Sequence, residues 1–231
     1  VGLTVLGVSK SRPLALTALA RCLSLPAAAD PVLEMMKSLS KEGPIYAYEM
    51  SYSDTDVTAN GLIDPSKPEG ERIEIYAPDE SEWTKDFRNG IADMEAQTDG
   101  DIWCADFAQM VPTDATATTE DETTVTYAFT PTPEADADKN EQKMMKQLNG
   151  TVTLDKSDGS VLAFNMVLPK PYKPAMVAKI NRFEMTASCD RAPDGRTYVE
   201  QFSMDIKGSA MMQSFEETVT RRITKLLDPV G

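Results

Sequence analysis

Carboxylates are the side chains of this sequence whose number makes chemistry conceivable. The chain carries 37 Asp and Glu residues, and adjacent pairs such as Glu216-Glu217 and Asp79-Glu80 could act together as a general acid and a general base. In a chain this rich in acids, adjacent pairs also arise by chance. We therefore interpret both pairs as solvent-exposed surface rather than as a catalytic site.

One acidic segment begins like a calcium-binding loop. Asp136, Asp138 and Asn140 stand at the first, third and fifth positions of such a loop. The sixth position is Glu141 instead of the glycine that makes the sharp turn, and the twelfth is Gln147 instead of the glutamate that binds calcium through both oxygens. We interpret the segment as the acidic N-terminus of a helix, where negative charge interacts favourably with the helix dipole, and we expect no metal.

The sequence contains no histidine. Histidine is the commonest general base and a common metal ligand, so its absence excludes Ser-His-Asp and Cys-His catalysis and most zinc sites. A Ser-x-x-Lys motif, from Ser38 to Lys41, lacks the companion motifs that such enzymes carry. We therefore expect a protein that is not an enzyme and that uses no cofactor.

Residues 1–29 have the layout of an N-terminal extension followed by a secretory signal peptide. Lys10 and Arg12 precede an apolar run over residues 13–25, and three alanines at positions 27–29 supply the small residues of a cleavage site. The run is too short to span a bilayer as a helix. The alternative is an amphipathic helix that stays attached. We expect cleavage after the alanines and export to the periplasm.

The rest of the chain, residues 30–231, is long enough for a single domain with a sizeable core. Without residues 1–29 the basic count falls from 23 to 20 against 37 acids, so the net charge changes from −14 to −17. Such a chain lacks the basic surface that binds nucleic acid and would be repelled by anionic lipid headgroups. Two small basic clusters occur, Arg221-Arg222 and Lys170 with Lys173, and we interpret both as charges at the edge of the fold rather than as binding sites. We expect no integral membrane segment, since no apolar run reaches the necessary length.

Two cysteines, Cys104 and Cys189, follow the predicted signal peptide. In an exported protein an even number of cysteines indicates a disulfide, because the compartment is oxidising. The alternative is two separate buried thiols. We favour the disulfide, which would close a long loop and stabilise the fold by up to about 4 kcal/mol.

The hydrophobic periodicity predicts a short opening helix followed by antiparallel hairpins. Leu33, Met36 and Leu39 share one helical face, and the period then changes to two. Strands are predicted around residues 46–52, 72–76, 124–130, 152–154, 162–168, 177–188, 202–206 and, as a strand rather than a helix, 215–223. Further helices are predicted over residues 80–97 and 138–148. Turns are predicted at residues 60–61, 65–70, 157–159 and 194–195, a helix end at 149–150, and a solvated loop at 113–122.

The apolar faces of these strands are candidates for the lining of a ligand cavity. The sequence has 13 methionines, which suit an adaptable apolar interior, although ordinary core is the alternative at each position. Two short Met-rich helices, around Leu33/Met36 and Met144/Met145, are expected to cover the cavity loosely. The candidate ligand-binding residues are Tyr46, Tyr48, Met50, Ile73, Ile75, Phe164, Met166, Phe202 and Met204.

Several segments together resemble a known family. They are "YAYEMSYSD" from residue 46, "GERIEIYAP" from residue 70, the following segment with Trp83, "VTYAFTPTP" from residue 125, "LNGTVTLDKSDGSVLAF" from residue 148 and the long hairpin over residues 177–206. In order and style they resemble the periplasmic outer-membrane lipoprotein-carrier (LolA-like) superfamily, and this chain would be a divergent member. The resemblance implies an α+β fold: a mainly antiparallel, half-open curved sheet, or incomplete β-barrel, covered by short helices.

The same resemblance implies the function. The chain is expected to be a periplasmic, noncatalytic carrier that holds a lipid or lipoprotein acyl chain in an apolar cavity, in the sorting of lipoproteins to the outer membrane. We expect a monomer. The alternative is a structural or interaction domain of the envelope, with a filled core and an acidic face that binds an envelope protein partner.

Overall fold

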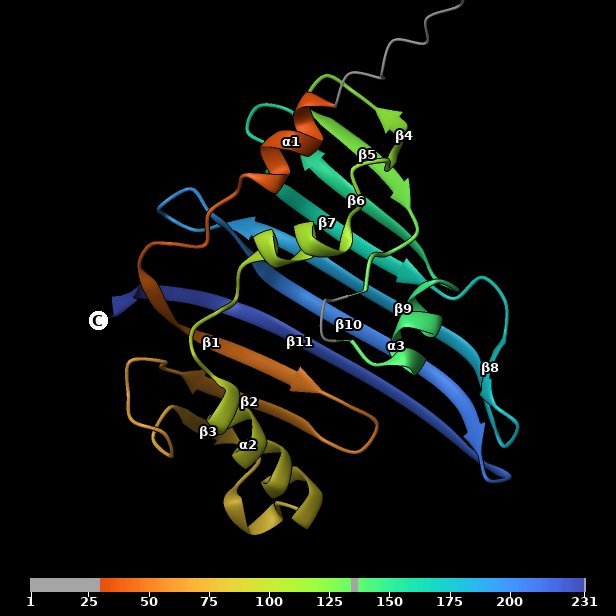
Figure 1. The fold of residues 1–231 in the computed structure, drawn as a ribbon. Helices are drawn as coiled ribbons and strands as arrows, with labels where there is room; N and C mark the ends of the chain where they lie inside the picture. Colours follow the sequence, from red (N-terminus) through yellow and green to blue (C-terminus); the bar gives the residue numbers. More distant parts are fainter. Residues whose placement is uncertain (1–29, 134–136, 231) are drawn as a thin grey trace, which may run out of the picture.

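The computed structural model describes residues 30–133 and 137–230. The predicted signal peptide, residues 1–29, lies outside the described residues, as does Asp136 of the acidic segment. The described chain forms one antiparallel sheet of eleven strands with short helices (Figure 1). The strands are β1 (Ile45–Ser53), β2 (Thr58–Ile63), β3 (Ile73–Ala77), β4 (Thr116–Glu120), β5 (Thr124–Phe129), β6 (Asn149–Asp155), β7 (Val161–Val167), β8 (Tyr172–Ala175), β9 (Ala178–Arg191), β10 (Thr197–Ala210) and β11 (Gln213–Val230). The helices are α1 (Pro31–Lys37), α2 (Lys85–Gln97) and α3 (Lys139–Met145), with 3₁₀ turns η1 (Glu80–Glu82) and η2 (Cys104–Met110).

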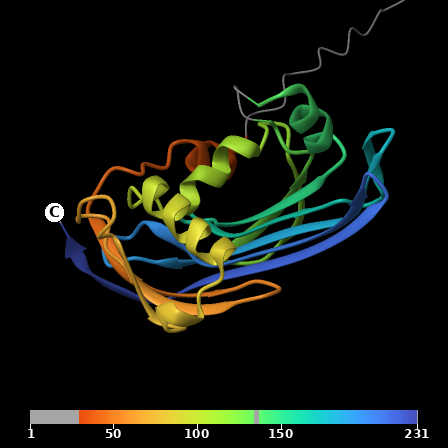
Figure 2. The same cartoon turned by 90° about the horizontal axis from the view of Figure 1, so that it is seen from below.

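The strand order is β3-β2-β1-β11-β10-β9-β7-β6-β5-β4, and β8 pairs with β9 beside this path. β1 lies beside β11, so strands far apart in the sequence meet within the sheet. The sheet is curved, and the helices lie on its concave side (Figure 2). It is open, because β3 and β4 stand at the two ends of the order. The prediction of a mainly antiparallel α+β fold with an open sheet is confirmed.

The opening helix forms as its sequence predicts. Asp30 caps α1, because its Oδ1 accepts hydrogen bonds from the backbone N–H groups of Val32 (2.9 Å) and Leu33 (3.4 Å). Pro31 stands in the first turn, where its missing N–H has no helical partner to lose. Leu33 and Met36 are buried against the sheet.

The core lies between the concave face of the sheet and the helices α1, η2 and α3. Tyr127, Val152, Phe164 and Ala187 lie side by side across β5, β6, β7 and β9, and all four are buried. The ring of Phe107 in η2 stacks on that of Phe164 with 4.5 Å between the centroids. This part of the interior is closely packed, which is typical of a stable core.

The predicted turn at Asn60-Gly61 is wrong, because both residues lie inside β2. A Cβ on Gly61 would lie 2.6 Å from the carbonyl oxygen of Glu74, so the glycine allows β3 to approach at an irregularity in the β2–β3 register. The chain turns earlier, where Asp54 Oδ1 accepts hydrogen bonds from the N–H groups of Asp56 (2.8 Å) and Val57 (2.7 Å).

Two other predictions are wrong, because residues with the composition of a loop or a helix end belong to strands of the sheet. The predicted loop over residues 113–122 contains β4, whose side chains are all exposed but whose backbone pairs with β5. Asn149 and Gly150 begin β6 rather than ending a helix, and a Cβ on Gly150 would collide with the ring of Phe129. The hairpin turns at 157–159 and 194–195 are confirmed, as is the strand in the tail, β11.

A disulfide joins Cys104 at the start of η2 to Cys189 in β9, across 85 residues of sequence. The predicted pairing is therefore confirmed, and it fits an oxidising, extracytoplasmic compartment. Within residues 30–133 and 137–230, no helix is both long enough and apolar enough to cross a bilayer.

Candidate functional site

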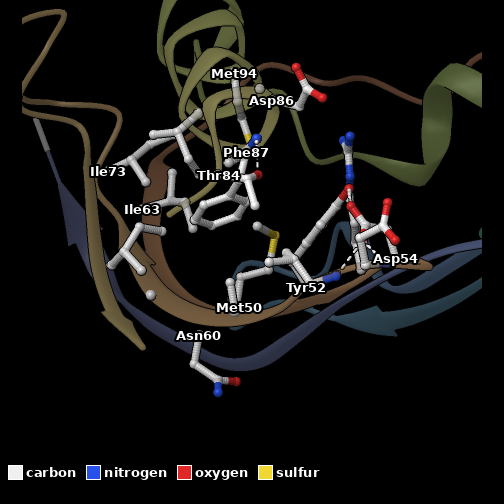
Figure 3. Close-up of a pocket in the computed structure, with 18 residues that line it drawn as sticks. Met50, Tyr52, Asp54, Asn60, Ile63, Ile73, Thr84, Asp86, Phe87 and Met94 are labelled. Carbon is white, nitrogen blue, oxygen red and sulfur yellow. Dashed lines mark hydrogen bonds between the residues drawn. The ribbon is translucent and has the colours of Figure 1, made fainter. Parts of the chain in front are cut away.

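Helix α2 lies above strands β1 to β3 and encloses a cavity of about 560 Å³, which we call the α2 cavity (Figure 3). This volume falls within the ordinary range of small-molecule sites. The apolar part of its wall comes from both sides: Met50, Ile63, Ile73 and Ile75 from the sheet, and Phe87, Ile91 and Met94 from the helix.

The apolar side chains of α2 face this cavity instead of packing directly on the strands. Phe87 and Met94 are only half-buried, and both point toward the space above Met50. Trp83, just before the helix, holds Phe87 in place through an edge-to-face contact with 5.4 Å between the ring centroids. Trp83 itself donates a hydrogen bond from Nε1 to the carbonyl oxygen of Pro78 (3.0 Å).

The other end of α2 is fixed by a buried carboxylate. Glu95 accepts backbone hydrogen bonds from Gly70 (3.0 Å), Arg72 (3.3 Å) and Ile73 (2.7 Å). Arg72 in turn donates from Nη1 to the carbonyl oxygen of Thr98 (2.7 Å). These contacts join the last turn of α2 to the β2–β3 hairpin, so the cavity roof is tethered mainly at its C-terminal end.

A second cavity of about 640 Å³, the η2 cavity, adjoins the first. Tyr48, Phe202 and Ile223 lie on its sheet side, and Trp103 and Phe107 on its other side. Its rim is acidic. The acidic residues that line it are Asp93, Asp99, Asp101 and Asp106.

One lysine partly neutralises this rim. Lys41 forms hydrogen-bonded ion pairs with Asp101 and Asp106, and these hydrogen bonds raise the pKa of Lys41 above its usual range. Burial raises the pKa of Asp106, and the contact with Lys41 works against that increase.

Four residues line both cavities: Met50, Gly90, Met94 and Arg221. Arg221 is the charged member of this set, and it stands on β11 directly opposite Tyr52 of β1. Its guanidinium carbon lies 6.0 Å from the centre of the Tyr52 ring. Within the described residues, no carboxylate lies within ion-pair distance of Arg221.

Asp54, which lines the α2 cavity, already accepts hydrogen bonds from other residues of the protein. The hydroxyl of Tyr52 donates a hydrogen bond to Asp54 Oδ2 (2.7 Å). Burial and this bond raise the pKa of Tyr52 to about 12. Burial alone would raise the pKa of Asp54, but the hydrogen bonds from Tyr52 and from the Asp56 and Val57 backbone outweigh it and lower the pKa.

Five of the nine candidate ligand-binding residues line a cavity in the structure, and four do not. Met50, Ile73 and Ile75 line the α2 cavity, and Tyr48, Met50 and Phe202 line the η2 cavity. The others lie outside these linings: Tyr46, Phe164 and Met166 in the packed core, and Met204 between Met185 and Val219 in the sheet. Contact of any of the nine with a ligand stays a prediction.

The expected loose cover is wrong for the helices named from the sequence. Leu33 and Met36 of α1 are almost completely buried in the core, and so is Met145 of α3. The cavity roof is α2 instead. Its spacing of Trp83, Phe87, Ile91 and Met94 is visible in the sequence, but nothing in that spacing distinguishes a roof from a packed helix. Arg221 was interpreted, with Arg222, as a charge at the edge of the fold, because an arginine in a strand is usually solvent-exposed; in the structure it also lines both cavities.

Within the described residues, no group of three or more Cys, Asp or Glu side chains is arranged to hold a metal ion. No protein-family model, curated protein or solved structure matches the chain. The site is therefore defined by its own geometry: two adjoining cavities whose walls combine apolar and acidic side chains, a helix as the roof, and Arg221 at their junction.

Proposed function

We propose that the chain is a noncatalytic periplasmic carrier that holds an acyl chain of a lipid or lipoprotein in the α2 cavity. The observation that carries this proposal is the apolar face of α2, where Phe87, Ile91 and Met94 line a cavity of about 560 Å³. Apolar side chains that border a cavity accessible to water are exposed to solvent, and this exposure is unfavourable in free energy. A bound hydrocarbon removes that cost, whereas a polar ligand does not.

The driving force scales with the length of the guest. Each buried methylene contributes about 0.8 kcal/mol. Association itself costs several kcal/mol in lost translation and rotation, so a chain of about ten methylenes or more is needed for useful affinity. Arg221 supplies a cation where a polar head would lie if the hydrocarbon fills the α2 cavity.

Other features support the proposed compartment and route. The Cys104–Cys189 disulfide supports an oxidising compartment, and residues 1–29 have the layout of an export signal. The LolA-like resemblance, together with an open antiparallel sheet whose concave side holds helices, supports a role in moving lipoproteins toward the outer membrane. The chain would then be a divergent member of that superfamily.

The test is the binding of a fluorescent long-chain fatty acid to the purified protein, measured by titration. Ile91→Trp fills the α2 cavity with apolar bulk and should weaken binding at least tenfold while the protein stays folded. Ala92→Trp is the matched control, because Ala92 is on α2 but exposed, and it should bind like the wild type. Ile75→Asp should also abolish binding, at some cost in stability.

Two results together would contradict the proposed carrier function. A folded wild-type protein that binds no fatty acid, and that carries no lipid in native mass spectrometry after purification from the periplasm, would contradict the carrier. The interaction domain of the envelope, with the acidic rim around Asp99 and Asp101 as its binding face, would then be the better proposal.

A further inference from the structure

The four most exposed large apolar side chains of the described residues lie at two neighbouring turns. One turn joins β8 to β9 and the other joins β10 to β11; we call them the paired turns, residues 174–178 and 210–213. The N–H of Met211 donates a hydrogen bond to the carbonyl oxygen of Val177 (2.9 Å), which ties the two turns together. Both lie at one end of the sheet, near the β8 label in Figure 1.

The exposure of these side chains is extreme. Met176 and Met212 are fully exposed, Met211 is 77 % exposed and Val177 is 60 % exposed. Phe215, two residues into β11, is 38 % exposed. Single exposed apolar residues are common, but a contiguous group on a protruding edge marks an interaction site.

The β10–β11 turn is built from unfavourable residues. Ala210 and Gln213 form the last pair of the hairpin, so Met211 and Met212 make a two-residue turn. Their φ angles are 50° and 68°, in the left-handed region, where Asn and Gly are strongly preferred. Folding alone would favour Asn-Gly here, so the methionines indicate a role for their side chains.

The charge around the β8–β9 turn is opposite to that of the whole chain. No acid occurs between Asp158 and Glu184 in the sequence, although the chain as a whole has a net charge of −14. That interval carries Lys170, Lys173 and Lys179 around the β8–β9 turn, and Arg182, which forms ion pairs with Glu184 and Asp205. None of these lysines forms an ion pair with another described residue.

We infer that the paired turns are a docking site for an anionic lipid bilayer, in which the methionines insert between headgroups and the lysines contact phosphates. Exposed apolar side chains next to lysines are the arrangement of interfacial membrane anchors. The turns protrude at the end of the sheet (Figure 2), a shape that suits insertion into a fluid surface. The rest of the acidic surface is screened beyond about 8–10 Å at physiological salt, so the local lysines decide the sign of the interaction.

Vesicle sedimentation tests the inference independently of the cavity. The full chain should sediment with vesicles of phosphatidylcholine and phosphatidylglycerol, and less with phosphatidylcholine alone. Met211→Asn/Met212→Gly should lower the partition coefficient at least tenfold. Because Asn-Gly suits this turn, the variant should keep or raise the melting temperature, which separates loss of docking from loss of folding. Lys170→Gln/Lys173→Gln should lower binding to the anionic vesicles at least fivefold.

A local probe provides the second readout. The emission of Met212→Trp should shift to shorter wavelength when anionic vesicles are added, because the indole enters the apolar layer. Tyr76→Trp, at an exposed position of the edge strand β3, is the matched control and should not shift. All variants share residues 1–29, so any binding by that segment contributes equally. Equal sedimentation of the Asn-Gly variant and the wild type, or no shift for Met212→Trp, would overturn the inference.

Discussion

Glu95 Oε1 accepts a hydrogen bond of 2.7 Å from the backbone N–H of Ile73, and this contact fixes the C-terminal end of α2 over the strand that forms one wall of the cavity. The side chain of Ile73 faces the cavity while its N–H holds the roof. The helix and the wall are therefore positioned by the same residue pair. A carboxylate with three backbone donors is a strong anchor, because charge-assisted hydrogen bonds are stronger than neutral ones.

Replacement of Glu95 should loosen this roof. Glu95→Ala removes the acceptor of three backbone donors, and each donor left without a partner costs about 1–3 kcal/mol where it is buried. We expect a lower free energy of unfolding in urea and faster hydrogen exchange at Ile73. Glu95→Gln keeps one carbonyl acceptor and should fall between the two. Unchanged exchange at Ile73 in Glu95→Ala would contradict the anchoring role.

Arg221 should recognise the acidic end of a guest. With a fatty acid and a fatty alcohol of equal chain length, Arg221→Gln should weaken only the acid, by about fivefold for a partly exposed ion pair. Lys225→Gln is the control, because Lys225 is also exposed on β11 but outside both cavity linings. Equal loss for acid and alcohol would mean that Arg221 acts through packing. No binding of either by the wild type would contradict the carrier itself.

The disulfide should carry a large share of the stability. Cys104→Ser/Cys189→Ser opens a loop of 85 residues, which should reduce the free energy of unfolding by up to about 4 kcal/mol. Urea unfolding of the variant and of the wild type, with and without a reductant, measures this. The reductant should destabilise only the wild type, and a wild type insensitive to it while its cysteines become alkylated would refute the prediction.

Asp121 should make the β4–β5 hairpin sensitive to acid. Backbone hydrogen bonds from Thr124 and Thr123 lower the pKa of Asp121 to about 2. A carboxyl whose pKa is lower in the folded state stabilises the fold above its unfolded pKa of about 4, and this contribution is lost as the pH falls through about 2. NMR titration of the carboxyl carbon checks the value. A midpoint near 4 in the folded protein would contradict it, and Asp121→Asn should remove the hairpin's dependence on pH in this range.

The sequence predicted the strands better than the turns, for a physical reason. Alternation such as Tyr46, Tyr48 and Met50 reports directly which face is buried, so β1 and most hairpin arms could be predicted. Gly61 and Gly150 look like turn residues, yet they serve the close approach of Glu74 and of the Phe129 ring. Such contacts involve strands that become neighbours only in the folded sheet, and a local pattern contains no information about them.

The sequence predicted cavity-lining residues on the sheet, but it did not predict that α2 covers them. Period-two alternation in the sequence identifies residues that face inward from a strand. It therefore predicted residues of the cavity floor, namely Met50, Ile73, Ile75 and Phe202. The roof depends on how far α2 stands from the sheet, which Glu95 sets through hydrogen bonds to the chain more than twenty residues earlier. Position along the sequence does not determine that distance, so the roof was assigned to α1 and α3 instead.

The pairing of β1 with β11 determines when the α2 cavity can form during synthesis. In the described part of the chain, strands β1 to β3 pair with the remaining sheet only through β11, which spans Gln213–Val230. A chain that emerges from its N-terminus can form the β5–β7 and β9–β10 hairpins early, since their partners are close in sequence. The floor of the α2 cavity must wait for β11. Newly made protein therefore exposes the apolar residues of β1 to β3 until β11 has been synthesised, and the α2 cavity is complete only after that step.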